Sequence, residues 1–291
     1  MKIKIVTDSC CDLSFEFIKA HDIQVLPLTI IMNGEEKEDD LAETMQYDSF
    51  YEAILNGAMP QTAQVNTYQF TEVFRECAKN NEPVIYIGFS SALSGCVNSA
   101  LMALEEVKEE YPEAEIAVVD SKCASMGQGL LVHYAVEQIK SGVNLKELVE
   151  WLESNKLQII HWFTVMDLNH LFRGGRLSKT AATFGSLLQI KPIMHINNEG
   201  RLIPMEKTKG RKKSLKTLVE KVKEDIVDPE HTVVCISHAS CLEEAEEVRD
   251  MILEECGVKE IKMNYIGATI GSHAGPGTIG IFFKGAQRKE K

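Results

Sequence analysis

Two short apolar runs limit what this chain can fold into. Residues 83–88 read Pro-Val-Ile-Tyr-Ile-Gly and residues 115–120 read Glu-Ile-Ala-Val-Val-Asp, so both have strand length without alternating apolar and polar positions. The absence of alternation is typical of strands buried on both faces, as in a parallel sheet. Amphipathic helical patterns separate such runs along the first half of the chain. Because strands alternating with helices are typical of α/β proteins, we predict an α/β fold with a parallel sheet.

The second half of the chain is less regular. Residues 197–200 (Asn-Asn-Glu-Gly) lie between two strand-like stretches and indicate a β-hairpin. A hairpin within an α/β series suggests a mixed sheet. We therefore expect two α/β domains, residues 1–155 with a mainly parallel sheet and residues 156–291 with a mixed sheet. The other elements expected in the second half are strands at 158–165, 232–237 and 259–266 and helices at 167–172, 177–188, 212–226 and 241–255.

Composition and charge argue against several classes of protein. With 31 basic and 43 acidic residues the net charge is −12, which disfavours general nucleic-acid binding because that requires a basic surface. The eight cysteines include no CxxC pair, so the sequence predicts no metal site. The chain has neither a secretory apolar segment nor a run of membrane-spanning length. We therefore expect reduced thiols in a cytoplasmic protein that makes at most transient membrane contact.

The segment 267–280 carries five glycines and a proline around Ser272 and His273. Glycine at this density lets the backbone approach a ligand closely and adopt positive φ. We interpret the segment as a loop in which His273 is a polar anchor, since histidine titrates near physiological pH. A tight connector with an incidental histidine is the alternative interpretation.

Hydroxyl side chains occur at two other turns. Ser94 and Gly95 follow the strand 83–88 and precede a long helical pattern, so free N–H groups at the helix start and the Ser94 hydroxyl suit an anion. Capping of that helix by Ser94 explains the same pattern equally well. Thr62 offers a further hydroxyl in the segment 60–66, which we interpret as a loop. The glycine spacing matches neither common nucleotide-binding motif.

Two basic clusters stand out in this acidic chain. Arg173 and Arg176 flank a Gly-Gly pair, which presents two guanidinium groups suited to carboxylate or phosphate. Lys207, Lys209 and Arg211 form the second cluster, which suits an acidic partner or a phosphate. An ordinary charged turn and a solvated face are the respective alternatives.

Taken together, these motifs resemble those of the DegV family, in the same order and over nearly the whole chain. The matching motifs are Thr7-Asp8-Ser9…Asp12, Pro60-x-Thr62-x-Gln64, Ser90-Ser91-x-Leu93-Ser94-Gly95, Asp120-Ser121, Gly127-x-Gly129, Arg173-Gly-Gly-Arg176-Leu-Ser178 and Gly271-Ser272-His273-x-Gly275-Pro276-Gly277. The resemblance implies a two-domain α/β protein with a long-chain fatty acid buried between the domains. It also implies the non-catalytic, fatty-acid-binding subunit of a bacterial fatty acid kinase, without cofactor. A separate ATP-dependent kinase would phosphorylate the presented carboxylate.

The resemblance also implies roles for individual residues. Thr62, Ser94 and His273, with the Gly95 N–H, would hold the carboxylate. Arg173, Arg176 and the cluster Lys207, Lys209 and Arg211 would lie at the pocket mouth or where the kinase docks. Ala63 and Cys96 depart from the family pattern, because hydroxyl residues are common at both positions.

A fatty acid is also reasonable on physical grounds. Each buried methylene contributes roughly 0.8 kcal/mol, whereas a buried carboxylate must be paired. Either pocket lining or ordinary core explains a set of apolar residues in the second half: Phe163, Met166, Leu168, Phe184, Leu187, Leu188, Ile190 and Ile193.

Two other functions are compatible with the same residues. An acyl-ester hydrolase would use Ser94 as nucleophile and His273 as base, with Asp8 or Asp120 orienting the histidine. The sequence around Ser94 is Ala-Leu-Ser-Gly-Cys, which lacks the Gly-x-Ser-x-Gly elbow. A different apolar carboxylate, such as a sterol acid, is the other alternative.

Overall fold

The computed structural model describes residues 3–178 and 190–290, which form three β-sheets and their covering helices. The first sheet has the order β2-β1-β6-β7, and all of its neighbouring strands are parallel. Its strands are β1 (Lys4–Asp8), β2 (Gln24–Leu26), β6 (Val84–Gly88) and β7 (Ile116–Asp120). The two apolar runs are thus neighbouring parallel strands, which confirms the prediction.

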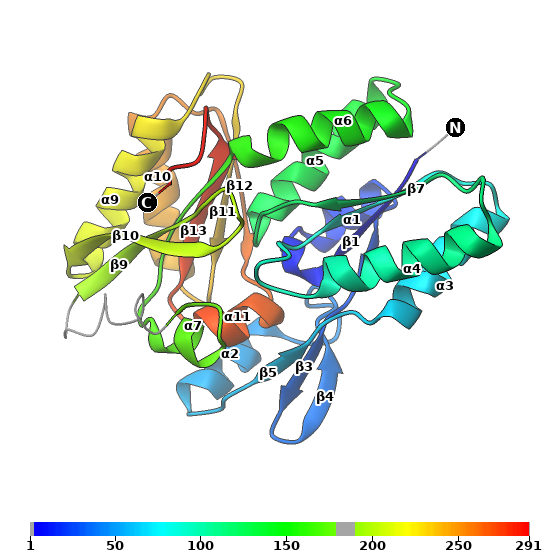
Figure 1. The fold of residues 1–291 in the computed structure, drawn as a ribbon. Helices are drawn as coiled ribbons and strands as arrows, with labels where there is room; N and C mark the ends of the chain where they lie inside the picture. The colour runs from blue at the N-terminus through cyan, green and yellow to red at the C-terminus, as the bar shows by residue number, and fades with distance from the viewer. Residues whose placement is uncertain (1–2, 179–189, 291) are drawn as a thin grey trace.

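Helices cover both faces of this sheet (Figure 1). On one face, α3 and α4 pack with β6 in an apolar cluster that includes Phe70, Phe74 and Tyr86. Asn66 starts α3 with a capping box, which satisfies backbone donors at the helix start. Apart from one helix described below with the third sheet, the helices of this half, with one short 3-10 turn, are η1 (Ser9–Cys11), α1 (Phe15–Ala20), α3 (Thr67–Lys79), α4 (Cys96–Glu110), α5 (Met126–Lys140) and α6 (Leu145–Asn155).

The second sheet is mixed, as predicted. Its order is β10-β9-β8-β13-β11-β12, in which β11 and β12 are parallel and the other pairs are antiparallel. The predicted hairpin is β9 and β10, with Ile196 opposite Leu202. The elements of this region are η2 (Lys156–Gln158), β8 (Ile159–Thr164), α7 (Asn169–Arg173), β9 (Ile190–Ile196), β10 (Leu202–Lys209), α9 (Arg211–Asp225), β11 (Val233–His238), α10 (Leu242–Glu255), β12 (Glu260–Tyr265), α11 (Ala268–Ala274) and β13 (Ile279–Lys284).

Helix α5 lies between the first and second sheets (Figure 1). Leu130 and Leu131 of α5 belong to one apolar cluster with Ile87 of the first sheet and Cys235 and Phe282 of the second. This shared cluster fixes the two sheets relative to each other. The division into domains 1–155 and 156–291 falls at the end of α6 and stays a prediction.

The interpretation of 267–280 as a loop was wrong. Residues 268–274 form α11, and residues 279–284 form β13 in the interior of the second sheet. A Cβ at Gly271 would lie 2.5 Å from the Tyr51 hydroxyl, so glycine here permits close helix packing. Helix α11 ends at Gly275, whose φ of +78° favours glycine.

A third sheet, β4-β3-β5, was not predicted and brings Thr62 into a strand. Its strands β3 (Thr29–Met32), β4 (Glu35–Glu38) and β5 (Gln61–Ala63) are antiparallel. The interpretation of Thr62 as a loop residue was therefore wrong, because β5 pairs with β3 through Ile30. Helix α2 (Tyr47–Leu55) lies between β4 and β5 in the sequence. The hydroxyl of its Tyr51 donates to the Ile266 carbonyl at 2.6 Å. This contact attaches α2 to the second half of the chain just before α11.

Nearly all of the helix predicted at 177–188 lies outside the described residues, as do Phe184, Leu187 and Leu188. None of the helices in the described ranges is both long enough and apolar enough to cross a membrane.

Candidate functional site

A mostly apolar cavity lies where the first sheet, the second sheet and α11 meet, and we call it the inner cavity. Its walls include Phe89 and Leu93 after β6, Phe163 of β8, Phe282 of β13 and Ile270 of α11. About 930 Å³ between the walls is unoccupied by protein atoms, including the part open to solvent. A concave, largely apolar space with few polar groups is typical of a small-molecule site.

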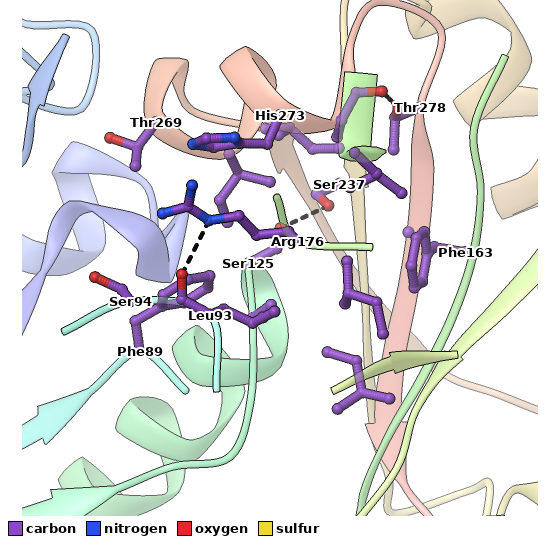
Figure 2. A pocket seen from close by; sticks show the side chains of 18 of the residues that line it. Phe89, Leu93, Ser94, Ser125, Phe163, Arg176, Ser237, Thr269, His273 and Thr278 are labelled. Atoms are coloured by element: carbon purple, nitrogen blue, oxygen red, sulfur yellow. Dashed lines mark hydrogen bonds between the residues drawn. The ribbon is translucent and has the colours of Figure 1, made fainter. Parts of the chain in front are cut away.

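The polar groups at one end of the inner cavity come from four separate segments. Thr62 lies on β5, Ser94 before α4, Arg176 after α7 and His273 on α11. Figure 2 shows the Arg176 guanidinium between the His273 ring and Ser94. The Thr62 Oγ1 and His273 Nε2 atoms are 2.9 Å apart. The structure thus brings together the three side chains predicted to hold a carboxylate.

His273 is uncharged at neutral pH. Burial, reinforced by the nearby Arg176 charge, lowers its pKa to about 4. The ring is held by Thr62 at Nε2 and by the backbone of Gly174, where a Cβ would collide with Nδ1. The Nδ1 atom is buried and has no hydrogen-bond partner among the described residues. This environment favours a neutral ring with a fixed position.

Arg176 is a cation on the wall of a mostly apolar space. Its Nε donates to the Leu93 carbonyl at 3.1 Å and its Nη1 to the Gly174 carbonyl at 2.5 Å. Burial lowers its pKa, but an arginine remains protonated at physiological pH. Within the described residues its hydrogen bonds go to backbone carbonyls and not to an acidic side chain. Sequence reasoning placed Arg176 only at the mouth or docking surface, whereas it also lines the inner cavity.

Ser94 and Gly95 stand at the start of α4. The Ser94 hydroxyl lies 3.2 Å from Cys96 Sγ and accepts a long, 3.4 Å bond from the Cys96 N–H. Burial raises the pKa of Cys96 to about 12, so the sulfur is a neutral and weak acceptor. A Cβ at Gly95 would collide with the Gln64 amide oxygen. The Ser94 hydroxyl therefore has only weak protein partners and is available to a ligand.

The arrangement differs from that of a serine hydrolase. His273 contacts Thr62, and no hydrogen bond joins it to Ser94 in the described part of the chain. Asp8 instead accepts from the Tyr86 hydroxyl at 2.6 Å. Asp120 pairs with Lys122 at 2.7 Å. Neither candidate acid therefore orients His273.

Asp8 and Asp12 form hydrogen bonds that position two of the segments carrying site residues. Asp8 accepts from the Phe89 N–H at 3.0 Å, which fixes the start of the segment leading to Ser94. Asp12 accepts from the Gly267 N–H at 2.9 Å and from the Ser125 hydroxyl at 2.5 Å. Since Gly267 is the N-cap of α11, Asp12 connects the end of η1 to the helix that carries His273.

Sequence reasoning missed some cavity residues. Ser125 and Ser237 line the inner cavity and lie 2.9 Å apart. Neither serine belongs to a motif to which the sequence assigned a role in the site. Gln64 belonged to a quoted motif without a predicted role, yet it lines the cavity and donates to Ser99 at 2.9 Å.

The apolar residues proposed as lining separate into three groups. Phe163 lines the inner cavity. Met166, Leu168, Ile190 and Ile193 do not: Leu168 packs in the apolar cluster that adjoins the cavity through Leu171, and Ile193 belongs to the core of the second sheet. The others lie outside the described residues.

A second, more polar cavity adjoins the first on its outer side, and we call it the outer cavity. Its walls include Pro60 before β5, Arg173 of α7 and Ser272 of α11. Thr62, Arg176 and His273 line both cavities and therefore separate them.

The second basic cluster lines neither cavity. Lys207 and Lys209 lie on β10, and Arg211 begins α9. The Arg211 guanidinium binds Glu244 of α10 through Nη2 at 2.6 Å and Nε at 3.1 Å. Part of this cluster thus joins two helices, and a docking role for it stays a prediction.

Known proteins share this sequence and architecture. A family model described as "Uncharacterised protein, DegV family" matches residues 2–285. A DegV domain-containing protein of Clostridium perfringens is 45% identical over 284 residues, which cover 98% of each chain.

Solved structures show the same likeness. DegV of Bacillus subtilis, described as a fatty acid binding protein, matches with a TM-score of 0.86 and 32% identity over 98% of this chain and 100% of that chain. A stearic acid-binding protein of Eubacterium ventriosum matches with a TM-score of 0.90 and 27% identity over 97% of this chain and 98% of that chain. The chain with these two adjoining cavities belongs to the DegV family.

Proposed function

We propose that this protein binds a long-chain fatty acid in the inner cavity and presents its carboxylate to a separate, cytoplasmic, ATP-dependent fatty acid kinase. The observation that carries the proposal is the group of Thr62, Arg176 and His273 at one end of a mostly apolar cavity. The fatty-acid and stearic-acid binding described for the B. subtilis and E. ventriosum proteins supports it.

The chemistry of the cavity suits both parts of a fatty acid. Burial of each methylene contributes roughly 0.8 kcal/mol, so the acyl chain supplies most of the affinity. The carboxylate needs a charge partner and hydrogen-bond donors when it leaves water. Arg176 offers the positive charge, and the hydroxyls of Thr62 and Ser94 offer donors. If His273 Nε2 donates to Thr62 Oγ1, the Thr62 proton is directed to the ligand.

The position of Thr62, Arg176 and His273 between the two cavities supports presentation to a kinase. The side chains that would hold the carboxylate also form the wall of the outer cavity. A carboxylate oxygen there would attack the terminal phosphorus of ATP bound to the kinase. The new O–P bond forms as the bond to the β-phosphate oxygen breaks, and ADP leaves with that electron pair. The product is an acyl phosphate, and the role of this protein is positioning.

Organic extraction of the purified protein with mass spectrometry tests the binding function. We expect a long-chain fatty acid in stoichiometric amount. After removal of the lipid, calorimetric titration with palmitate should give saturable binding that His273→Ala weakens roughly tenfold or more, because hydrogen bonds in charged sites contribute about 1.5–3 kcal/mol. The control is His231→Ala, since His231 is exposed and lines neither cavity. Absence of fatty-acid binding would overturn the proposal.

The hydrolase alternative and the kinase partnership need separate assays. Steady turnover of acyl esters that Ser94→Ala abolishes would establish hydrolysis and contradict a presenting role. For the partnership, fatty-acid-loaded protein is incubated with ATP and a fatty acid kinase, and acyl phosphate is trapped with hydroxylamine. We expect product only when loaded protein and kinase are both present.

A further inference from the structure

Two buried serine hydroxyls interrupt the apolar part of the inner cavity. Ser125, the N-cap of α5, is 4% exposed, and Ser237 on β11 is 0% exposed. Both residues line the inner cavity, and their Oγ atoms are 2.9 Å apart. In the view of Figure 2 the pair lies between Arg176, at the proposed carboxylate end, and the Phe163 ring. A saturated acyl chain offers these hydroxyls no hydrogen bond, so the proposed function does not explain them.

The pairing of the second sheet places Ser237 part of the way along the cavity. Ser237 on β11 lies opposite Gly280 on β13. Thr278, two residues before Gly280, donates to the last carbonyl of α11 at 3.1 Å, and Phe282 lies two residues after Gly280. All four residues line the cavity. Since alternate residues of a strand face the same side about 7 Å apart, the Ser237 hydroxyl lies deeper than the end of α11 and short of Phe282.

Two backbone features keep this hydroxyl pair in place and uncovered. A Cβ at Gly280 would lie 3.3 Å from Ser237 Oγ and 2.6 Å from the Phe282 ring, so a side chain there would fill the space beside the hydroxyl. Ser125 has a φ of +54°, which is disfavoured for residues other than glycine. A serine persists in such a conformation only where the surrounding structure holds it, and here its hydroxyl contacts Asp12 and Ser237.

One hydrogen-bonding position on Ser237 is unfilled. The Ser125 hydroxyl donates to the Asp12 carboxyl at 2.5 Å, so it accepts from Ser237. Ser237 Oγ has no other partner among the described residues, and its lone pairs are therefore available. A ligand hydroxyl can donate to them, whereas a keto oxygen cannot. The ligand hydroxyl also fits the reverse direction, in which a protonated Asp12 donates to Ser125, because it accepts as well as donates.

We propose that Ser237, oriented by Ser125 and Asp12, is a subsite for a hydroxyl group in the middle of the acyl chain, so that the protein binds mid-chain hydroxylated fatty acids as well as unsubstituted ones. The inference rests on the proposed function and deepens it by naming a substrate class. A chain hydroxyl that enters an apolar cavity loses its hydrogen bonds to water. The Ser237 contact replaces one of them, and an unsubstituted chain leaves Ser237 with the partner it already has.

The test compares ligands of equal chain length on lipid-free protein by calorimetric titration. The ligands are stearate and 8-, 10- and 12-hydroxystearate. We expect Ser237→Ala to weaken the tightest-binding hydroxystearate roughly tenfold, as the loss of one buried hydrogen bond predicts, and to leave stearate binding unchanged. The variant should fold, because Asp12 keeps its bonds from Ser125 and Gly267. The matched control is Ser214→Ala, which removes a buried hydroxyl of α9 that lines neither cavity.

The outcomes separate the two proposals. If stearate fails to bind the wild-type protein, the proposed function fails. If stearate binds but Ser237→Ala weakens both kinds of ligand equally, or neither, the inference fails while the proposed function stands. Wild-type protein that binds every hydroxystearate about a hundredfold more weakly than stearate would also overturn the inference, because the cavity would then reject a chain hydroxyl. Unchanged stearate binding in the variant shows that the cavity is intact, so misfolding cannot imitate the expected result.

Discussion

His195 offers a test of the buried polar structure that supports the second sheet. The ring is 0% exposed on β9. Its Nε2 accepts from the Lys289 N–H at 3.1 Å, so Nδ1 carries the proton and donates to the His161 carbonyl at 2.8 Å. Protonation of Nε2 would replace this accepted bond by a clash between two donors. The test lowers the pH and compares the wild type with His195→Gln, in which the side-chain amide retains a donor and an acceptor.

The size of the effect follows from the pKa of His195. Burial is the main cause that lowers this pKa from 6.5 to about 4, and the charge of Arg288 adds to it. Below pH 6.5 the unfolded chain therefore binds a proton that the folded protein does not, so stability falls as the pH falls. Each pH unit costs about 1.4 kcal/mol. Between pH 6.5 and roughly pH 5, we expect His195 to lower the free energy of unfolding by about 2 kcal/mol.

The variant is needed because the titration of other buried groups changes the free energy of unfolding in the opposite direction. Burial raises the pKa values of Asp8 and Asp12, so these carboxyls favour the folded state as the pH falls. His161 adds to the acid loss, since burial places its pKa well below the usual value. The wild-type curve alone reports the sum of all these groups, whereas the difference between wild type and His195→Gln isolates one.

The assay is urea unfolding of both proteins at about pH 7.5 and pH 5, followed by tryptophan fluorescence. We expect the loss of stability on acidification to be about 2 kcal/mol larger for the wild type than for His195→Gln. The exposed His231→Gln variant should behave as the wild type. Equal acid losses in wild type and His195→Gln would refute the assignment of a neutral, accepting ring to His195.

Three substitutions test other contacts of the fold and site. Gly174→Ala places a Cβ against Nδ1 of His273, so palmitate affinity measured by calorimetry should fall roughly tenfold while the circular dichroism spectrum is unchanged. Tyr86→Phe removes the 2.6 Å hydrogen bond to the buried Asp8 carboxyl and should lower the free energy of unfolding in urea by about 1–3 kcal/mol. Arg288→Met removes a guanidinium that is 3% exposed and donates to carbonyls from both halves of the chain. The melting temperature should drop by the equivalent of about 3 kcal/mol or more, and an unchanged value would show that these bonds contribute nothing.

Local sequence predicted the neighbouring strands β6 and β7 because both are uninterrupted apolar runs, visible at 83–88 and 115–120 without knowledge of any partner. β6 is buried along its whole length, whereas β7 lies at the sheet edge and is mostly half-buried. The β9–β10 hairpin was predicted for a similar reason, since the Asn-Asn-Glu-Gly turn is a local signal.

The same reasoning failed for α11 and β13. Glycine disfavours a helix interior by about 1 kcal/mol per residue relative to alanine, so a glycine-rich segment was expected to be a loop. Packing decided otherwise, because Gly271 lets α11 approach Tyr51 and Asp12 holds the helix start at Gly267. Contacts between residues more than two hundred positions apart leave no local pattern.

The sequence by itself determined the α/β class and, through motifs resembling the DegV family, the candidates Thr62, Ser94 and His273. Thr62 lies on a strand, Ser94 before a helix and His273 on a helix, but each belongs to a motif whose residue types are visible locally. Only the tertiary structure decided that Arg176 lines both cavities and that Lys207, Lys209 and Arg211 line neither. The physical reason is that a cavity wall is made by side chains from several segments. Their charge and burial depend on how the sheets, α7 and α11 pack together.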